Sequence, residues 1–142
     1  MSLEKWLYYA QAFHLVLRDE PLFSDALEAW KWGPVVPEVY HQYSGFGSGS
    51  IVVAHDAPLV ELGQSMQTFL TQVVGFLCRH TSMNLSRATH LEAPWIDASD
   101  QQDVMPQSAI KSFFRSLMSD FQDILRTRLS RLQLKKVWAY QI

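Results

Sequence analysis

The sequence has little of what secreted, membrane-spanning and disordered proteins require. Only one of its 142 residues is cysteine, so no disulfide can form within the chain. Charged residues make up 18% of the chain and hydrophobic residues 48%, a composition that can bury enough apolar surface to fold. The most apolar run, 69–77, is interrupted by Thr71, Gln72 and Gly75 and is too short for a bilayer. We therefore expect one folded domain with no membrane partner.

The start of the chain and its one cysteine predict a cytoplasmic protein. Residues 1–5 lack the basic and apolar segments of a secretory signal peptide. Cys78 follows Val74, Phe76 and Leu77, and these apolar neighbours predict a buried thiol in a reducing compartment. A redox or nucleophilic role for Cys78 is the alternative.

Apolar residues recur at three- and four-residue steps in three long segments, which predicts amphipathic helices. The first covers 3–17, with His14 in the core, and the second covers 59–77 and is expected to be the central helix. The third begins after Pro106 with a stripe that includes Ile110, Phe114 and Leu117. Shorter helices are expected at about 37–43 and from 82 towards 90, where residues 93–95 stop the helix before a polar loop, 97–103. The predicted fold class is mainly α, a compact domain of about five helices.

Between the first two helices the sequence predicts a small β-hairpin or short strands. Pro21 ends the first helix, and residues 22–23 and 27–30 could pair across a turn at 24–26. Gly33 and Pro34 are expected to break regular structure. Residues 44–50 contain Gly-x-Gly-x-Gly, but no apolar strand precedes them and no Lys-Ser or Lys-Thr follows, so we interpret them as a flexible loop and not as a phosphate site.

Charge divides the chain into two parts. Residues 1–110 carry five basic and twelve acidic side chains, a net charge of -7, whereas residues 111–142 carry seven basic and two acidic, a net charge of +5. We expect a domain over 1–118 and a basic amphipathic helical extension over 119–142 packed on it. Basic residues with Trp138 and Tyr140 could bind nucleic acid. The apolar positions Leu125, Leu129 and Leu132 favour docking on protein instead.

Ionisable residues are too scattered to indicate a reaction centre. No two of the five histidines have the i, i+4 spacing of a helical metal site, and no serine lies in a Gly-x-Ser-x-Gly elbow. We therefore assign no catalytic residue, no metal ligand and no cofactor. The enzymatic alternative is a small metal-dependent hydrolase that uses His90 with Asp97 or Glu92.

Tryptophan is concentrated in segments that also contain proline and glycine. Trp30, Trp32 and Trp95 lie in such segments, where large aromatic rings are typical of protein-binding surfaces. Some of these rings could equally be core anchors.

Several motifs together resemble the Panacea domain family. They are 7–15 (LYYAQAFHL), 20–23 (EPLF), 28–40 (EAWKWGPVVPEVY), Leu85-Ser86, Thr89-His90, Pro94-Trp95 and 110–114 (IKSFF). This family is associated with phages and plasmids, and many members act as antitoxins. The resemblance implies a mainly helical module that neutralises a protein toxin, encoded by a neighbouring gene, through direct binding.

The resemblance also bears on partners, completeness and site residues. At least one relative is thought to hand its toxin to a protease, so a protease is a further implied partner. Relatives usually carry a helix before the leucine-tyrosine-tyrosine segment; either that helix is missing from this sequence, or the basic tail takes its place. The residues expected to touch the partner or shape its site are Trp30, Lys31, Trp32, Gly33, Pro34, Pro37, Tyr40, His90, Pro94 and Trp95.

Overall fold

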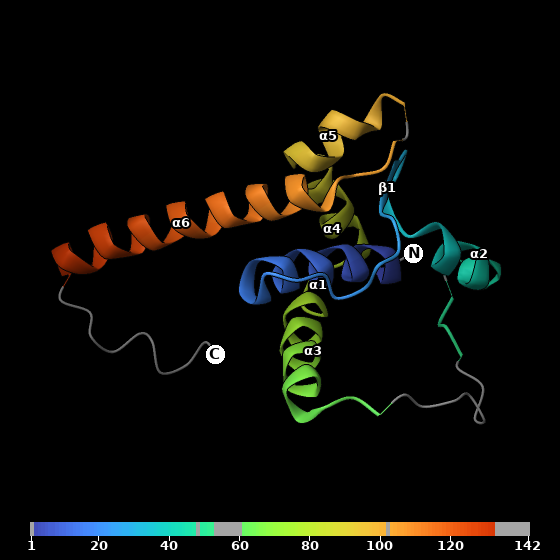
Figure 1. Cartoon of the computed structure of the whole chain (residues 1–142), viewed down its shortest axis with the longest axis horizontal. Coiled ribbons are helices and arrows are strands. Elements are labelled where there is room, and N and C mark those ends of the chain that lie inside the picture. The colour runs from blue at the N-terminus through green and yellow to red at the C-terminus, as the bar shows by residue number, and fades with distance from the viewer. Residues whose placement is uncertain (1, 48, 53–60, 102, 133–142) are drawn as a thin grey trace.

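The computed structural model describes residues 2–47, 49–52, 61–101 and 103–132, with side chains from Leu3 to Asp120 (Figure 1). Over these residues the fold is mainly helical with one small two-stranded sheet, as the sequence predicts, and it has six α-helices where about five are expected. In chain order the elements are α1 (Ser2–Arg18), β1 (Glu28–Trp30), β2 (Gly33–Val35), α2 (Pro37–Tyr43), the short 3-10 helix η1 (Ser44–Phe46), α3 (Gln64–Leu77), α4 (Ser82–Thr89), α5 (Ala93–Ser99) and α6 (Gln107–Leu132).

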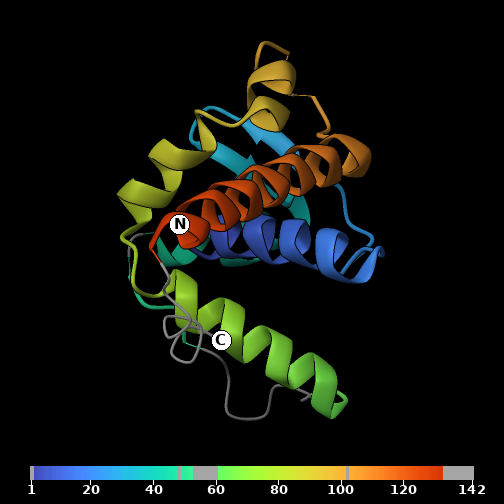
Figure 2. The same ribbon diagram turned by 90° about the vertical axis from the view of Figure 1, so that its left-hand side faces the viewer.

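Helix α1 forms the centre of the fold. Helices α3, α4 and α6 and strand β2 all pack against it, and both views place α3 on one side of α1 and α6 on the other (Figures 1 and 2). Five consecutive residues of α1, 8–12, are buried, so this helix is enclosed on most of its circumference. The prediction that the 59–77 segment is the central helix is wrong, because α1 is the one element of the described part of the chain against which α3 packs extensively.

The predicted hairpin lies between the first two helices, but one segment later than expected. Strands β1 and β2 are antiparallel, with Ala29 opposite Pro34 and Trp30 opposite Gly33, so residues 31–32 form the turn. Gly33 and Pro34 therefore belong to a strand and do not break the structure. The strand tolerates a proline because β1 has a second neighbour, a bridge from Glu28 to Val104, whereas β2 lies at the edge of the sheet.

Proline positions explain the short helices. The predicted helix at Pro37–Tyr43 is confirmed, with its proline in the first turn. Residues 93–95, expected to stop a helix, instead begin α5, since Pro94 also lies in a first turn. Asp97 is therefore helical and not part of a loop.

Two predictions about single side chains have opposite outcomes. His14 is 1% exposed, as predicted, and its Nδ1 lies 2.8 Å from the carbonyl oxygen of Glu20. Cys78 is exposed, contrary to prediction, because it caps the end of α3 beyond the last buried residue of that helix, Leu77.

Among the side chains that the structure describes, those in the first turns of α6 pack on α1. Ile110 and Phe114 are buried, whereas Leu117 is 47% exposed. The helix then continues beyond the other elements (Figure 1). Residues 133–142, the end of the extension predicted at 119–142, lie outside the described residues. In the described part of the chain, no helix combines the length and apolarity needed to cross a membrane.

Candidate protein-binding site

Side chains from α4, its C-terminal end and α5 hold the turn of the hairpin. They contact the three consecutive backbone carbonyls of residues 30–32. Trp95 Nε1 donates to the first carbonyl at 3.0 Å, His90 Nε2 lies 3.0 Å from the second, and Ser86 Oγ donates to the third at 3.1 Å. These contacts fix the backbone of a turn that the two strands alone would constrain weakly.

The start of α1 holds the second strand from another direction. The Glu4 carboxylate accepts the Val36 N–H at 2.9 Å, and Lys5 Nζ donates to the Pro34 carbonyl at 3.2 Å. Both charged side chains are buried. Burial raises the pKa of Glu4, and burial lowers the pKa of Lys5 to about 8. Sequence analysis missed this pair, since charges in the first turn of a helix are usually solvated.

Gly33 is required at its position for two reasons. Its φ of +105° is disfavoured for any residue with a side chain. A Cβ at this site would also lie 2.8 Å from both Lys5 Cε and Thr89 Oγ1. The glycine therefore allows the strand to lie directly against α1 and α4.

Two tyrosines tie α1 to the residue that precedes α5. The hydroxyls of Tyr8 and Tyr9 donate to the two oxygens of the Glu92 carboxylate, at 2.7 and 2.8 Å. Burial raises the pKa of Glu92, and burial together with the nearby carboxylate raises the pKa of both tyrosines. Because α5 also packs on β1, this contact positions the element that carries Trp95.

The enzymatic alternative finds no support in this geometry. Both oxygens of Glu92 accept tyrosine hydroxyls, and both ring nitrogens of His90 contact carbonyl oxygens, of Lys31 at 3.0 Å and Ser86 at 2.5 Å. Among the residues that the structure describes, no group of three or more His, Cys, Asp or Glu side chains could hold a metal ion. These polar groups are engaged in holding the fold.

Only two of the ten residues singled out from the sequence point into solvent. Lys31 is exposed, Trp32 is 71% exposed, and the Lys31 ammonium lies 5.1 Å from the centroid of the Trp32 ring. We call these two residues the hairpin tip. The other eight are buried or half-buried and support it: Trp30, Gly33, Pro34, Pro37, Tyr40, His90, Pro94 and Trp95.

The half-buried aromatics pair with one another beneath the tip. The Trp30 and Tyr40 rings have centroids 5.0 Å apart, and those of His90 and Trp95 are 4.2 Å apart. Trp30 Nε1 also donates to the Glu28 carboxylate at 2.7 Å. Residues of the motifs at 28–40, 89–90 and 94–95 thus converge in space beneath the tip.

Comparison with known proteins identifies the family of this chain. The sequence model of the family described as "Antitoxin SocA-like, Panacea domain" matches residues 3–96. The chain belongs to this family. The matched range contains every side chain that holds the hairpin of this Panacea domain, from Glu4 to Trp95.

One curated relative and the solved structures add to this comparison. Antitoxin SocA of Caulobacter vibrioides (strain NA1000 / CB15N) is 42% identical to the Panacea-domain chain over 52 residues, which are 37% of this chain. The match spans 28% of the relative's own length. No solved structure matches the chain.

Proposed function

We propose that this protein is a non-enzymatic antitoxin that neutralises a protein toxin by binding it directly in the cytoplasm. Membership of the SocA-like Panacea family and the name of the Caulobacter relative support an antitoxin role. The toxin is the product of a neighbouring gene, carried with this one on a phage or another mobile element.

The observation that carries the proposal is a solvent-exposed tryptophan on a rigidly held turn. Trp32 is 71% exposed, whereas the backbone carbonyls around it are held by three side chains. Tryptophan is among the residues that contribute most to protein-protein binding, and a pre-ordered loop loses little entropy on association. The hairpin tip therefore has the properties of an anchor for a protein partner.

Co-expression with the neighbouring gene tests the proposal. We expect that gene to stop growth when expressed alone, the wild-type protein to restore growth, and Trp32→Ala to restore it poorly. Phe46→Ala is the matched control, because Phe46 is a 39% exposed aromatic outside the hairpin. A harmless neighbouring gene, or full protection by a folded Trp32→Ala variant, would contradict the proposal.

A further inference from the structure

A second surface, on the α3 side of the molecule, also has the composition of an interface. Helix α3 contains no Asp, Glu, Lys or Arg in its 14 residues. Val74 is 42% exposed and Phe76 is 51% exposed, and among the described elements their helix packs extensively against α1 alone. The centres of protein-protein interfaces are depleted of charge in the same way.

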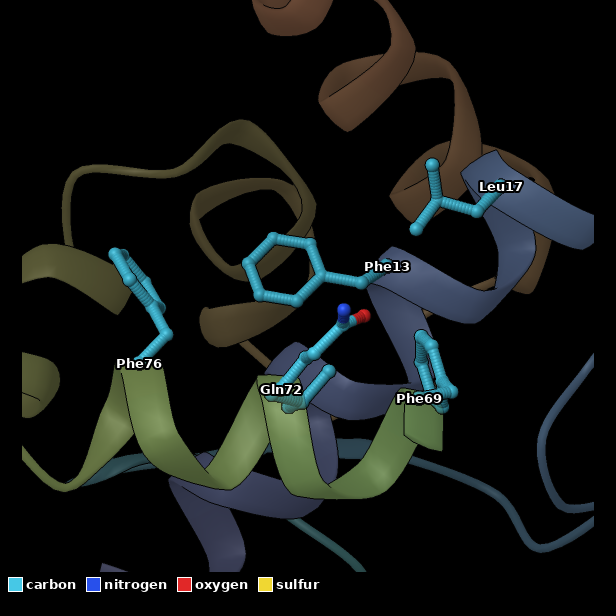
Figure 3. A pocket seen from close by; sticks show the side chains of 6 residues that line it. Phe13, Leu17, Phe69, Gln72 and Phe76 are labelled. Carbon is cyan, nitrogen blue, oxygen red and sulfur yellow. The ribbon is translucent and has the colours of Figure 1, made fainter. Parts of the chain in front are cut away.

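The surface between α1 and α3 is hollowed on two sides of one aromatic pair. The rings of Phe13 and Phe76 have centroids 6.3 Å apart and line both hollows. The first hollow, of about 250 Å³, lies among side chains of α1 and α3 (Figure 3), and the second, of about 290 Å³, extends to α4. Since a cavity of roughly 150 Å³ can hold benzene, each can accept a leucine or phenylalanine side chain. Together we call them the groove.

Basic residues directly adjoin, in the sequence, residues that line both ends of the groove. At one end the Arg18 guanidinium donates to two oxygens of the neutral residue Ser65. The distances are 2.6 Å to Ser65 Oγ and 3.3 Å to the Ser65 carbonyl oxygen. At the other end Arg79 is the second residue after α3 and precedes the lining residue His80, and Arg87 lies on α4 directly before the lining residue Ala88. No lining residue is acidic. Asp19 and Glu20 directly follow Arg18 in the sequence, and the Asp19 carboxylate is already paired with Lys111 and Arg115, at 2.6 and 2.8 Å.

We propose that the groove binds an amphipathic helix of the toxin that carries two apolar anchors and acidic residues beside them. The inference rests on the proposed function, because the toxin supplies the helix. Docking of an apolar helix face into a groove is a common mode of recognition. Charge argues against the chain's own residues 133–142 as the occupant, since Lys135 and Lys136 would meet basic groove ends.

The test measures dissociation of the complex between the full chain and the neighbouring gene's product, immobilised through a tag on the toxin. We expect Gln72→Glu to speed dissociation at least tenfold and Gln72→Lys to leave it unchanged or slower. Gln72 lines the groove but is exposed, so neither variant disturbs the core. The difference should shrink as salt is raised from 50 to about 500 mM, because salt screens exposed charges.

Replacement of apolar side chains by glutamine provides the second part of the test. Phe76→Gln should also speed dissociation at least tenfold, whereas Val52→Gln, at a 74% exposed position outside the groove, should change it less than twofold. Circular dichroism checks that each variant is folded.

The failures of the two proposals are distinguishable. If no wild-type complex forms, the proposed function fails and the groove proposal fails with it. If the complex forms but all groove variants dissociate at the wild-type rate, only the groove proposal fails. Tighter toxin binding after deletion of residues 133–142 would show that the chain's own tail fills the groove. A wild-type dimer that Phe76→Gln converts to a monomer, with toxin dissociation unchanged, would assign the groove to a second copy. Either result overturns the proposal.

Discussion

The hairpin side and the α3 side of this Panacea domain are held by different forces. The hairpin backbone is fixed by directional hydrogen bonds from five side chains, of which two are buried charges. Helix α3 is held mainly by apolar packing on α1, with Phe69, Val73 and Leu77 as its buried residues and an exposed hydrogen bond from Arg18 to Ser65 at its start. Hydrogen bonds fix single atoms, whereas apolar packing tolerates small shifts. The comparison suggests a rigid anchor on one side and an adaptable groove on the other.

The largest effect is expected where the hairpin touches α1 and α4. Gly33→Ala should lower the free energy of unfolding by about 3 kcal/mol or more, since it adds two close contacts and a disfavoured φ. Gly75→Ala on α3 is the control, because a Cβ there meets nothing within 4 Å. That variant should be neutral or more stable by about 1 kcal/mol. Urea unfolding measures both, and equal effects would erase the contrast between the two sides.

Buried Lys5 should give the hairpin side a pH signature. Its pKa is lowered from 10.5 to about 8, so the unfolded chain binds more protons than the folded protein between these values. Stability should therefore rise with pH, by roughly 2 kcal/mol from pH 8 to 9.5. The raised tyrosine pKa values act in the opposite direction above about pH 10, where the unfolded chain loses tyrosine protons first.

Lys5→Met should remove this dependence and give a flat profile in urea unfolding between pH 8 and 9.5. A wild-type protein that loses stability over the same window, or a Lys5→Met variant that retains the rise, would show that the ammonium is not desolvated as described.

A smaller effect is expected from single tryptophan donors. Trp95→Phe removes the bond to the Trp30 carbonyl and should cost about 1 to 2 kcal/mol. Trp6→Phe is the matched control, because in the described part of the chain the buried Trp6 Nε1 has no hydrogen-bond partner. Thermal unfolding should show a clearly lower midpoint only for Trp95→Phe. A larger loss for Trp6→Phe would mean that ring packing outweighs the hydrogen bond.

The smallest effect on stability is expected at the surface of α3. Val74→Gln should change the free energy of unfolding by no more than about 0.5 kcal/mol, because Val74 is 42% exposed. Urea unfolding provides the check. A loss above 1 kcal/mol would show that α3 packs more tightly than its exposed face indicates.

The sequence predicts the helices well because their apolar spacing repeats over many residues. Pro37 marks the start of α2 correctly, and Pro94 likewise lies in the first turn of α5, where the sequence predicts the end of a helix. Gly33 and Pro34 predict a break in regular structure because their signal is local, whereas the strand they form lies against α1 and α4. Local rules cannot supply such long-range contacts.

The sequence predicts which residues belong to the candidate site, but it does not predict what each of them does there. Motif resemblance selects ten residues, and only the structure shows that the hairpin tip is exposed while the others support it. Glu4 escapes sequence analysis because its partner, the Val36 N–H, is a backbone group 32 residues away. The sequence does not predict the groove, because apolar residues such as Phe13, Phe69 and Phe76, which line it, are also typical of a protein core.

The most direct test of the central claim, that the fold holds Trp32 for a protein partner, is the dissociation rate of the toxin complex with Trp32→Ala. The account predicts dissociation about 30-fold faster, equivalent to about 2 kcal/mol, with the free energy of unfolding unchanged. An unchanged dissociation rate in a fully folded Trp32→Ala protein would contradict it.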